Sequence, residues 1–133
     1  MNLTTTAAPG WVVWALRVLA TAHLAGVLAQ AVLAGLFVTG DVDLLAWHRG
    51  NGGFTHSVLY LQTLAAFLLW RPARVALWPA LASLGLVAME LAQIGLGQAR
   101  VIALHIPLGM AVFGLSAVFT AWTWWSLRVR AAA

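Results

Sequence analysis

The chain has 133 residues, 63% of them hydrophobic and only 8% charged, whereas soluble domains carry about 25% charged residues. A water-soluble fold of this length cannot bury so much apolar surface, so we expect an integral membrane protein. The net charge of +4 comes from seven arginines at the ends of apolar segments, which excludes a nucleic-acid-binding face, and the absence of cysteine excludes disulfides and thiolate metal sites.

Four apolar segments follow one another along the chain, and each is long enough to cross about 30 Å of hydrocarbon as a helix. We expect these spans at about residues 11–38, 44–70, 75–96 and 101–127. Turn-forming residues separate them, and the connections are short, so the helices must run antiparallel. The sequence therefore predicts one all-α domain over residues 1–133, an integral membrane four-helix bundle with up-down-up-down topology.

The arginines also predict how the bundle lies in the membrane, because positive residues collect on the cytoplasmic side. Five of them fall on the side of the two termini and the middle loop: Arg17, Arg71, Arg74, Arg128 and Arg130. Only Arg49 and Arg100 fall on the other side, near Asp41 and Asp43. We therefore expect a multi-pass protein of a bacterial plasma membrane with both termini in the cytoplasm.

An internal two-helix repeat carries most of the functional signal. Leu28-Ala29-Gln30 is followed, past a loop, by His48 and Gly52, and Leu91-Ala92-Gln93 is followed, past a loop, by His105 and Gly109. Each copy thus runs from an apolar helix with a glutamine to a helix that opens with His-x-x-x-Gly. Two such copies related by a pseudo-twofold axis place both histidines at the same depth, facing each other.

The depth of these histidines supports that arrangement. Each lies 22 residues before the cytoplasmic end of its span, Trp70 or Leu127, which corresponds to about 33 Å of helix. Two level imidazoles on facing helices with apolar walls are what a b-type haem requires. We therefore predict one haem b with His48 and His105 as iron ligands.

Small and basic neighbours complete the predicted haem site. A side chain at Gly52 or Gly109, one turn beyond each histidine, would collide with a porphyrin plane, so glycine fits there. Arg49 and Arg100 flank the site at the outer surface, where they can pair with the haem propionates.

Three further ionisable residues fall at middle depth: His23, His56 and Glu90. Such groups inside a membrane are costly and usually functional. We expect a secondary polar site that serves as a proton relay, a quinone-binding spot or an anchor behind the haem, or else hydrogen bonds that only hold the helices together. A second haem on His23 and His56 is less expected, because two porphyrins about 12 Å apart would crowd so slim a bundle.

The motifs around both histidines resemble the four-helix module that occurs twice in the haem A synthase family. That family opens its second helix with Glu-x-x-His-Arg-x-x-Gly or Ala, and the segment 45–52 matches at His48, Arg49 and Gly52. Leu104-His105-Ile106-Pro107-Leu108-Gly109 is similar to the start of its fourth helix. The chain also resembles short actinobacterial four-helix membrane proteins of unassigned function. The resemblance implies a haem held by His48 and His105, and a homodimer that rebuilds the pair of modules.

The chain departs from that family at Leu45, which stands where the family has a glutamate tied to its methyl-oxidising chemistry. Our leading hypothesis is therefore a membrane-embedded b-type cytochrome in electron transfer or haem handling, with quinol or a membrane redox protein as partner. One alternative is a non-catalytic membrane scaffold or subunit without cofactor. Another is a haem-modifying enzyme of the haem A synthase type, with Asp41 or Asp43 as its carboxylate. Whether the protein is an enzyme stays open at this point.

Overall fold

The computed structural model describes residues 8–71 and 76–127. It contains four helices, which are α1 (Gly10–Val38), α2 (Leu44–Trp70), α3 (Trp78–Gln98) and α4 (Ile102–Trp125). The predicted all-α four-helix bundle is confirmed, and the helix ends differ from the predicted ones by at most three residues. Among the arginines used to predict orientation, Arg74, Arg128 and Arg130 lie outside the described residues.

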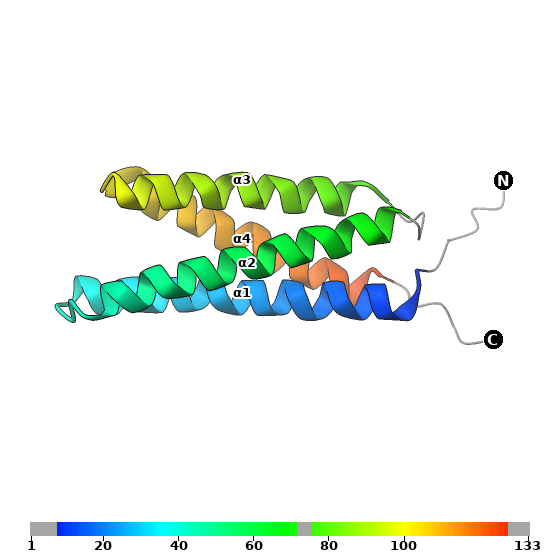
Figure 1. Ribbon diagram of the computed structural model, residues 1–133, viewed down its shortest axis with the longest axis horizontal. Coiled ribbons are helices and arrows are strands. Elements are labelled where there is room, and N and C mark those ends of the chain that lie inside the picture. The colour runs from blue at the N-terminus through cyan, green and yellow to red at the C-terminus, as the bar shows by residue number, and fades with distance from the viewer. Residues whose placement is uncertain (1–7, 72–75, 128–133) are drawn as a thin grey trace.

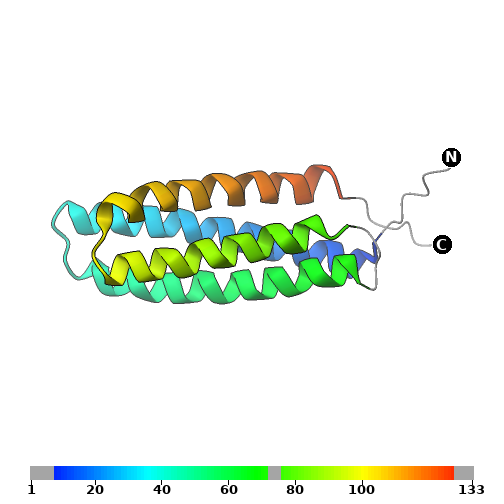
Figure 2. The same ribbon diagram turned by 90° about the horizontal axis from the view of Figure 1, so that it is seen from above.

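The helices form a closed ring in chain order. Each helix packs along its neighbours in the chain and α1 packs along α4, whereas within the described ranges the backbones of α1 and α3, and those of α2 and α4, do not come close to each other. Helices α2 and α4 therefore lie diagonally opposite, as the repeat predicted. We call the end with the 39–43 and 99–101 connections the histidine end and the opposite end, where α1 begins and α4 ends, the terminal end (Figures 1 and 2).

The helices exchange their closest partners along the bundle. Near the histidine end, Asn51 of α2 donates its Nδ2 hydrogen to the backbone oxygen of Gly26 in α1, at 2.9 Å. Near the terminal end, Gln62 of α2 instead donates to the hydroxyl of Ser83 in α3, at 3.2 Å. The hydroxyl of Thr120 in α4 donates to the backbone oxygen of Ala20 in α1. At the histidine end the bundle therefore consists of an α1–α2 layer and an α3–α4 layer, and Figure 1 shows these two layers diverging toward that end.

The two repeats also end their first helix in the same way. In both, the two amides after the helix cap donate backward to helical carbonyls in the pattern of a Schellman motif. The bonds run from Gly40 to Phe37, from Asp41 to Leu36, from Arg100 to Gly97 and from Val101 to Leu96. Gly40 has a positive φ of 119°, and Arg100 occupies the equivalent position with a φ of 58°.

Buried side chains are concentrated in the terminal half and the middle of the bundle. A core of buried apolar residues, which includes Leu16, Leu69 and Phe119, occupies the terminal end, and a smaller cluster around Leu59 lies near the middle. No residue in 28–54 or 91–111, both fully described, is buried. The histidine half therefore has no closed core of its own.

Arg17 of α1 forms hydrogen bonds to the end of α4 at the terminal end of the bundle. Its guanidinium donates to the backbone oxygens of Thr123 at 2.9 Å and Leu127 at 3.1 Å. It also lies 5.2 Å from the ring centres of both Trp14 and Trp124. Because the last carbonyls of a helix lack partners and carry partial negative charge, a buried cation satisfies them well.

Three of the four helices, α1, α3 and α4, are long and apolar enough to cross a membrane. Large apolar side chains cover the outside of the bundle, among them Val32, Met110 and Val118, which suits a lipid environment. Helix α2, which has 27 residues, is not among these three. It is less apolar because it carries most of the inward polar groups, including His48, His56 and Gln62.

Candidate functional site

The structure brings His48 and His105 together at the histidine end. His48 comes from α2 and His105 from α4, and their ring centres lie 6.3 Å apart with an interplanar angle of 61°. Both side chains are half-buried. Since their helices are diagonal, the two rings meet across the middle of the bundle and not along one packed helix interface.

Matching hydrogen bonds orient both rings. His48 Nδ1 lies 3.2 Å from the backbone oxygen of Gln30, and His105 Nδ1 lies 3.0 Å from that of Gln93. A carbonyl oxygen only accepts, so Nδ1 carries the hydrogen in each ring and Nε2 is left as the basic nitrogen. This arrangement, with the second ring nitrogen bonded to a carbonyl, is the usual one for a metal-binding histidine.

The glycines one turn beyond each histidine face glutamine side chains. A Cβ on Gly52 would lie 2.9 Å from Gln30 Nε2, and a Cβ on Gly109 would lie 2.6 Å from Gln93 Nε2. In this structure the glycines therefore make room for the two amides, and the expectation that they make room for a porphyrin remains a prediction. A glutamine amide is the end of a flexible side chain, so it can rotate away from the glycine surface.

The two copies differ in how the glutamine side chain is held. Gln30 Oε1 accepts a hydrogen bond of 2.9 Å from Asn51. In the second copy Leu108 stands three residues after the histidine, where the first copy has Asn51. Gln93 Oε1 is accordingly buried without a hydrogen-bond partner among the described residues.

The two arginines assigned to the site lie at its rim. Arg49 directly follows His48 in the first turns of α2, and Arg100 lies in the connection between α3 and α4, where both are exposed. Arg100 adopts the left-handed backbone conformation that normally favours glycine. An arginine kept in a strained position next to a candidate site points to a role for its side chain.

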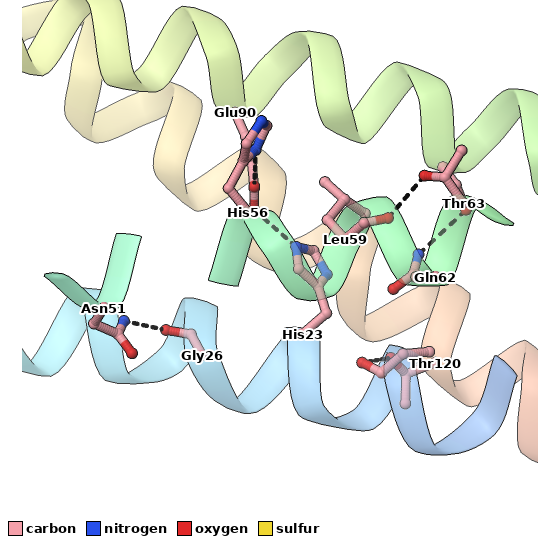
Figure 3. A network of polar contacts seen from close by, with 11 residues as sticks. His23, Gly26, Asn51, His56, Leu59, Gln62, Thr63, Glu90 and Thr120 are labelled. Atoms are coloured by element: carbon pink, nitrogen blue, oxygen red, sulfur yellow. Dashed lines mark hydrogen bonds and ion pairs between the residues drawn. The ribbon is translucent and has the colours of Figure 1, made fainter. Parts of the chain in front are cut away.

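The three mid-depth residues form one hydrogen-bonded series. Glu90 Oε1 lies 2.7 Å from His23 Nε2, and Glu90 Oε2 lies 2.8 Å from His56 Nδ1. These residues come from α3, α1 and α2, and Figure 3 shows them pointing toward one another in the centre of the bundle. All three are buried, with exposed fractions of 1% for His23 and 8% for both Glu90 and His56.

Tyr60 extends this series and was missed from the sequence. Its hydroxyl lies 2.8 Å from His56 Nε2, and the residue is 52% exposed on the outside of the bundle. The spacing of four residues from His56, one helical turn, was the signal that could have identified it. We call His23, Glu90, His56 and Tyr60 the central polar network.

The members of the network are bonded to one another in sequence. Glu90 holds one nitrogen of His23 and one of His56, and Tyr60 holds the other nitrogen of His56. No group of three or more histidine, cysteine or acidic residues within 8–71 and 76–127 is arranged to hold a metal ion. One imidazole thus connects the buried carboxylate to the exposed phenol.

Fold and site together define a class, a membrane-type four-helix bundle with two opposed histidines at one end and a buried acid–imidazole network at its centre. Comparison with models of protein families, with curated proteins and with solved structures gives no match.

Proposed function

We propose that this protein is a membrane-embedded b-type haem-binding protein, ligated by His48 and His105, that acts in electron transfer or haem handling. The observation that carries the proposal is the opposed pair of imidazoles, 6.3 Å apart and each with Nδ1 bonded to a backbone carbonyl. Two different helices, two copies of one motif and two matching hydrogen bonds converge on this pair.

The separation of the rings fits two ligands of one iron. A metal–imidazole bond is about 2 Å long and the ring centre lies about 1 Å beyond the nitrogen, so two rings on opposite sides of one metal have centres about 6 Å apart. The observed distance is 6.3 Å. This separation is compatible with one metal held by both rings.

The histidine half has no closed core that would have to be displaced by a cofactor. None of the residues in 28–54 or 91–111, all of them described, is buried, and the α1–α2 and α3–α4 layers diverge there (Figure 1). His48 and His105 would hold the haem, with one ligand from each layer. Apolar and small residues on the inner faces would form its walls, as in haem-binding helical bundles.

The rim supplies the charge that haem requires. Arg49 and Arg100 are exposed at the histidine end, where they would pair with the propionates. The left-handed conformation of Arg100, with φ of 58°, supports a role there, because glycine would be less strained.

A bound haem would supply one-electron chemistry at this end of the membrane. A haem held by both His48 and His105 would suit electron transfer or haem handling better than oxygen activation. The resemblance of the segments 45–52 and 104–109 to the haem A synthase module supports the same cofactor. Leu45 replaces the family's glutamate, so we do not extend the proposal to its oxidising activity.

The bundle is proposed to cross a bacterial plasma membrane with its terminal end in the cytoplasm. Helix α2 would cross together with the three more apolar helices, because it lies against α1 and α3 and its central polar groups are bonded to them. Paired polar groups inside a bundle are compatible with a membrane.

The test is a titration of the purified full chain, in mild detergent, with hemin. We expect one equivalent to bind and the reduced protein to show the sharp, split α band of a bis-histidine haem b. Mass analysis of the extracted porphyrin distinguishes haem b from a modified haem. Protein that takes up no hemin, or only binds it without the low-spin spectrum, would refute the proposal.

A further inference from the structure

The central polar network has one exposed end, and that end faces lipid. Tyr60 is 52% exposed on the outside of α2, and Leu61 and Leu64 beside it are also exposed. Tyr60 lies 16 residues after Leu44 and 10 before Trp70, so it is about 24 Å from one end of the helix and about 15 Å from the other. This depth is inside the hydrocarbon layer, where no bulk water reaches a phenol.

From the hydrocarbon side the network leads directly to a buried acid. Tyr60 contacts His56 at 2.8 Å, His56 contacts Glu90 at 2.8 Å and Glu90 contacts His23 at 2.7 Å. An unprotonated His56 Nε2 accepts the hydrogen of Tyr60, while both imidazoles donate to the carboxylate of Glu90. The network then has a net charge of −1, which is costly at this depth.

Addition of one proton removes that charge without breaking a hydrogen bond. When His56 carries the added proton on Nε2, it donates to Tyr60 and still donates from Nδ1 to Glu90. The positive charge of His56 then lies 2.8 Å from the carboxylate of Glu90, and the two charges cancel. The network is thus built to accept one proton at a time from its Tyr60 end.

We propose that Tyr60 and His56 form the docking and deprotonation site for a lipid-soluble hydroquinone. This inference rests on the proposed haem function, because the haem is the electron acceptor. A molecule that meets Tyr60 must come through the lipid, and one that donates both protons and electrons there must carry oxidisable hydroxyl groups. A hydroquinone has this chemistry, and its apolar part would lie along the exposed leucines of α2.

The step is balanced as follows. One hydroquinone O–H bond breaks, its proton passes to the Tyr60 oxygen while the hydrogen of Tyr60 moves to His56 Nε2, and one electron leaves for the oxidised haem. The haem is then reduced and one semiquinone is left. Two semiquinones, produced by two haem-loaded chains, disproportionate into one quinone and one hydroquinone, so each haem accepts one electron and no further oxidant is needed. Glu90 lies on the side of the network away from Tyr60. It precedes Gln93 by about one turn of α3, and the backbone oxygen of Gln93 accepts the hydrogen bond of His105.

The titratable groups around this network are few. Helix α1 contributes His23, α2 contributes His56 and Tyr60, and α3 contributes Glu90, while the described part of α4 carries at this depth only the hydroxyl of Ser116. The nearest buried cation, Arg17, is bonded to the end of α4. Removal of one member should therefore stop the proton transfer, with no neighbouring acid or base to replace it.

The experiment compares the reduction of the haem-loaded full chain by a short-chain hydroquinone and by dithionite, with stopped-flow absorbance as the readout. Dithionite should reduce the wild type, Tyr60→Phe and Glu90→Gln at equal rates. With the hydroquinone, we expect haem reduction to be at least tenfold slower in Tyr60→Phe and at least a hundredfold slower in Glu90→Gln than in the wild type. The solvent deuterium isotope effect on the rate of the wild type should be absent in both variants. Gln62→Met, which removes a buried polar side chain of α2 outside the network, should retain the wild-type rate.

Equal hydroquinone rates in the wild type, Tyr60→Phe and Glu90→Gln would overturn the proposal. A second measurement does not depend on haem: an azido-quinone should photolabel the α2 segment around Tyr60 in the apoprotein, and free hydroquinone should compete with it. Labelling spread evenly over all lipid-facing helices would also overturn the proposal. Failure to bind hemin, in contrast, refutes the haem function while the photolabelling still tests the quinone site.

Discussion

The two ends of this bundle differ in how much of their side-chain surface is buried. At the terminal end, Leu16, Leu69 and Phe119 belong to a buried core, and Arg17 bonds α1 to the last turn of α4. At the histidine end the equally described segments 28–54 and 91–111 contain no buried residue. The buried apolar contacts of the described bundle are therefore concentrated at its terminal end and middle.

The two ends also differ in which helices their hydrogen bonds join. At the terminal end the long-range bonds join helices of different repeats, as Arg17 and Thr120 do between α1 and α4. At the histidine end the bonds stay within one repeat, from His48 to Gln30 and from His105 to Gln93. Each of these two histidines is therefore fixed to its own layer, and within residues 28–54 and 91–111 no side-chain hydrogen bond joins the two layers.

The largest expected effect is at the histidine end. His105→Ala should weaken hemin binding by at least about 100-fold, because removal of a metal ligand costs more than the 10- to 100-fold loss seen for residues behind a ligand. The melting temperature of the apoprotein should hardly change, since the histidine is only half-buried. A hemin titration and a thermal melt measure the two effects.

His48→Ala should reproduce both results, because the two histidines have equivalent contacts. If either variant melts far below the wild type without any change in hemin binding, the histidines serve only to hold the bundle together. That outcome would favour the scaffold interpretation of the sequence.

At the terminal end the opposite pattern is expected for Arg17→Met. Loss of its bonds to Thr123 and Leu127 leaves buried carbonyls without donors, which should destabilise the bundle by about 2 kcal/mol. Affinity for hemin should remain unchanged in the folded fraction. Unfolding in mixed detergent measures the stability, and Arg71→Met is the matched control, because Arg71 is exposed and lies over Trp70 alone.

Enlarged side chains should separate the two ends further. Ala66 is fully buried in the terminal core, so Ala66→Leu should destabilise the apoprotein by about 1–2 kcal/mol through overpacking. Ala34 of α1 is half-buried at the histidine end, so Ala34→Leu should leave apoprotein stability unchanged and reduce the amount of hemin bound. Equal destabilisation by both substitutions in the same unfolding assay would show that the histidine end is as tightly packed as the terminal end.

Much of this difference could not be predicted from the sequence. The apolar runs and their breaks predicted the helices, and the repeat predicted that His48 and His105 would approach from diagonal helices. The bond from Arg17 to Thr123 joins residues 106 apart in the chain, and only the packed structure determines it. The glutamine amides next to Gly52 and Gly109 were missed for a similar reason, because rotamers depend on the neighbouring helix.

The smallest effect concerns the two equivalent helix ends, where Gly40 and Arg100 both have positive φ. Because a non-glycine residue is strained there, Arg100→Gly should stabilise the apoprotein by about 0.5–1 kcal/mol, whereas the same change at exposed Arg49, inside α2, should destabilise it. If Arg100 binds a propionate, the same variant should also bind hemin several-fold more weakly. Hemin esterified at both propionates should bind the wild type and Arg100→Gly equally, and a difference that persists with the ester would mean that Arg100 acts on the backbone of the connection and not on the charge of the haem.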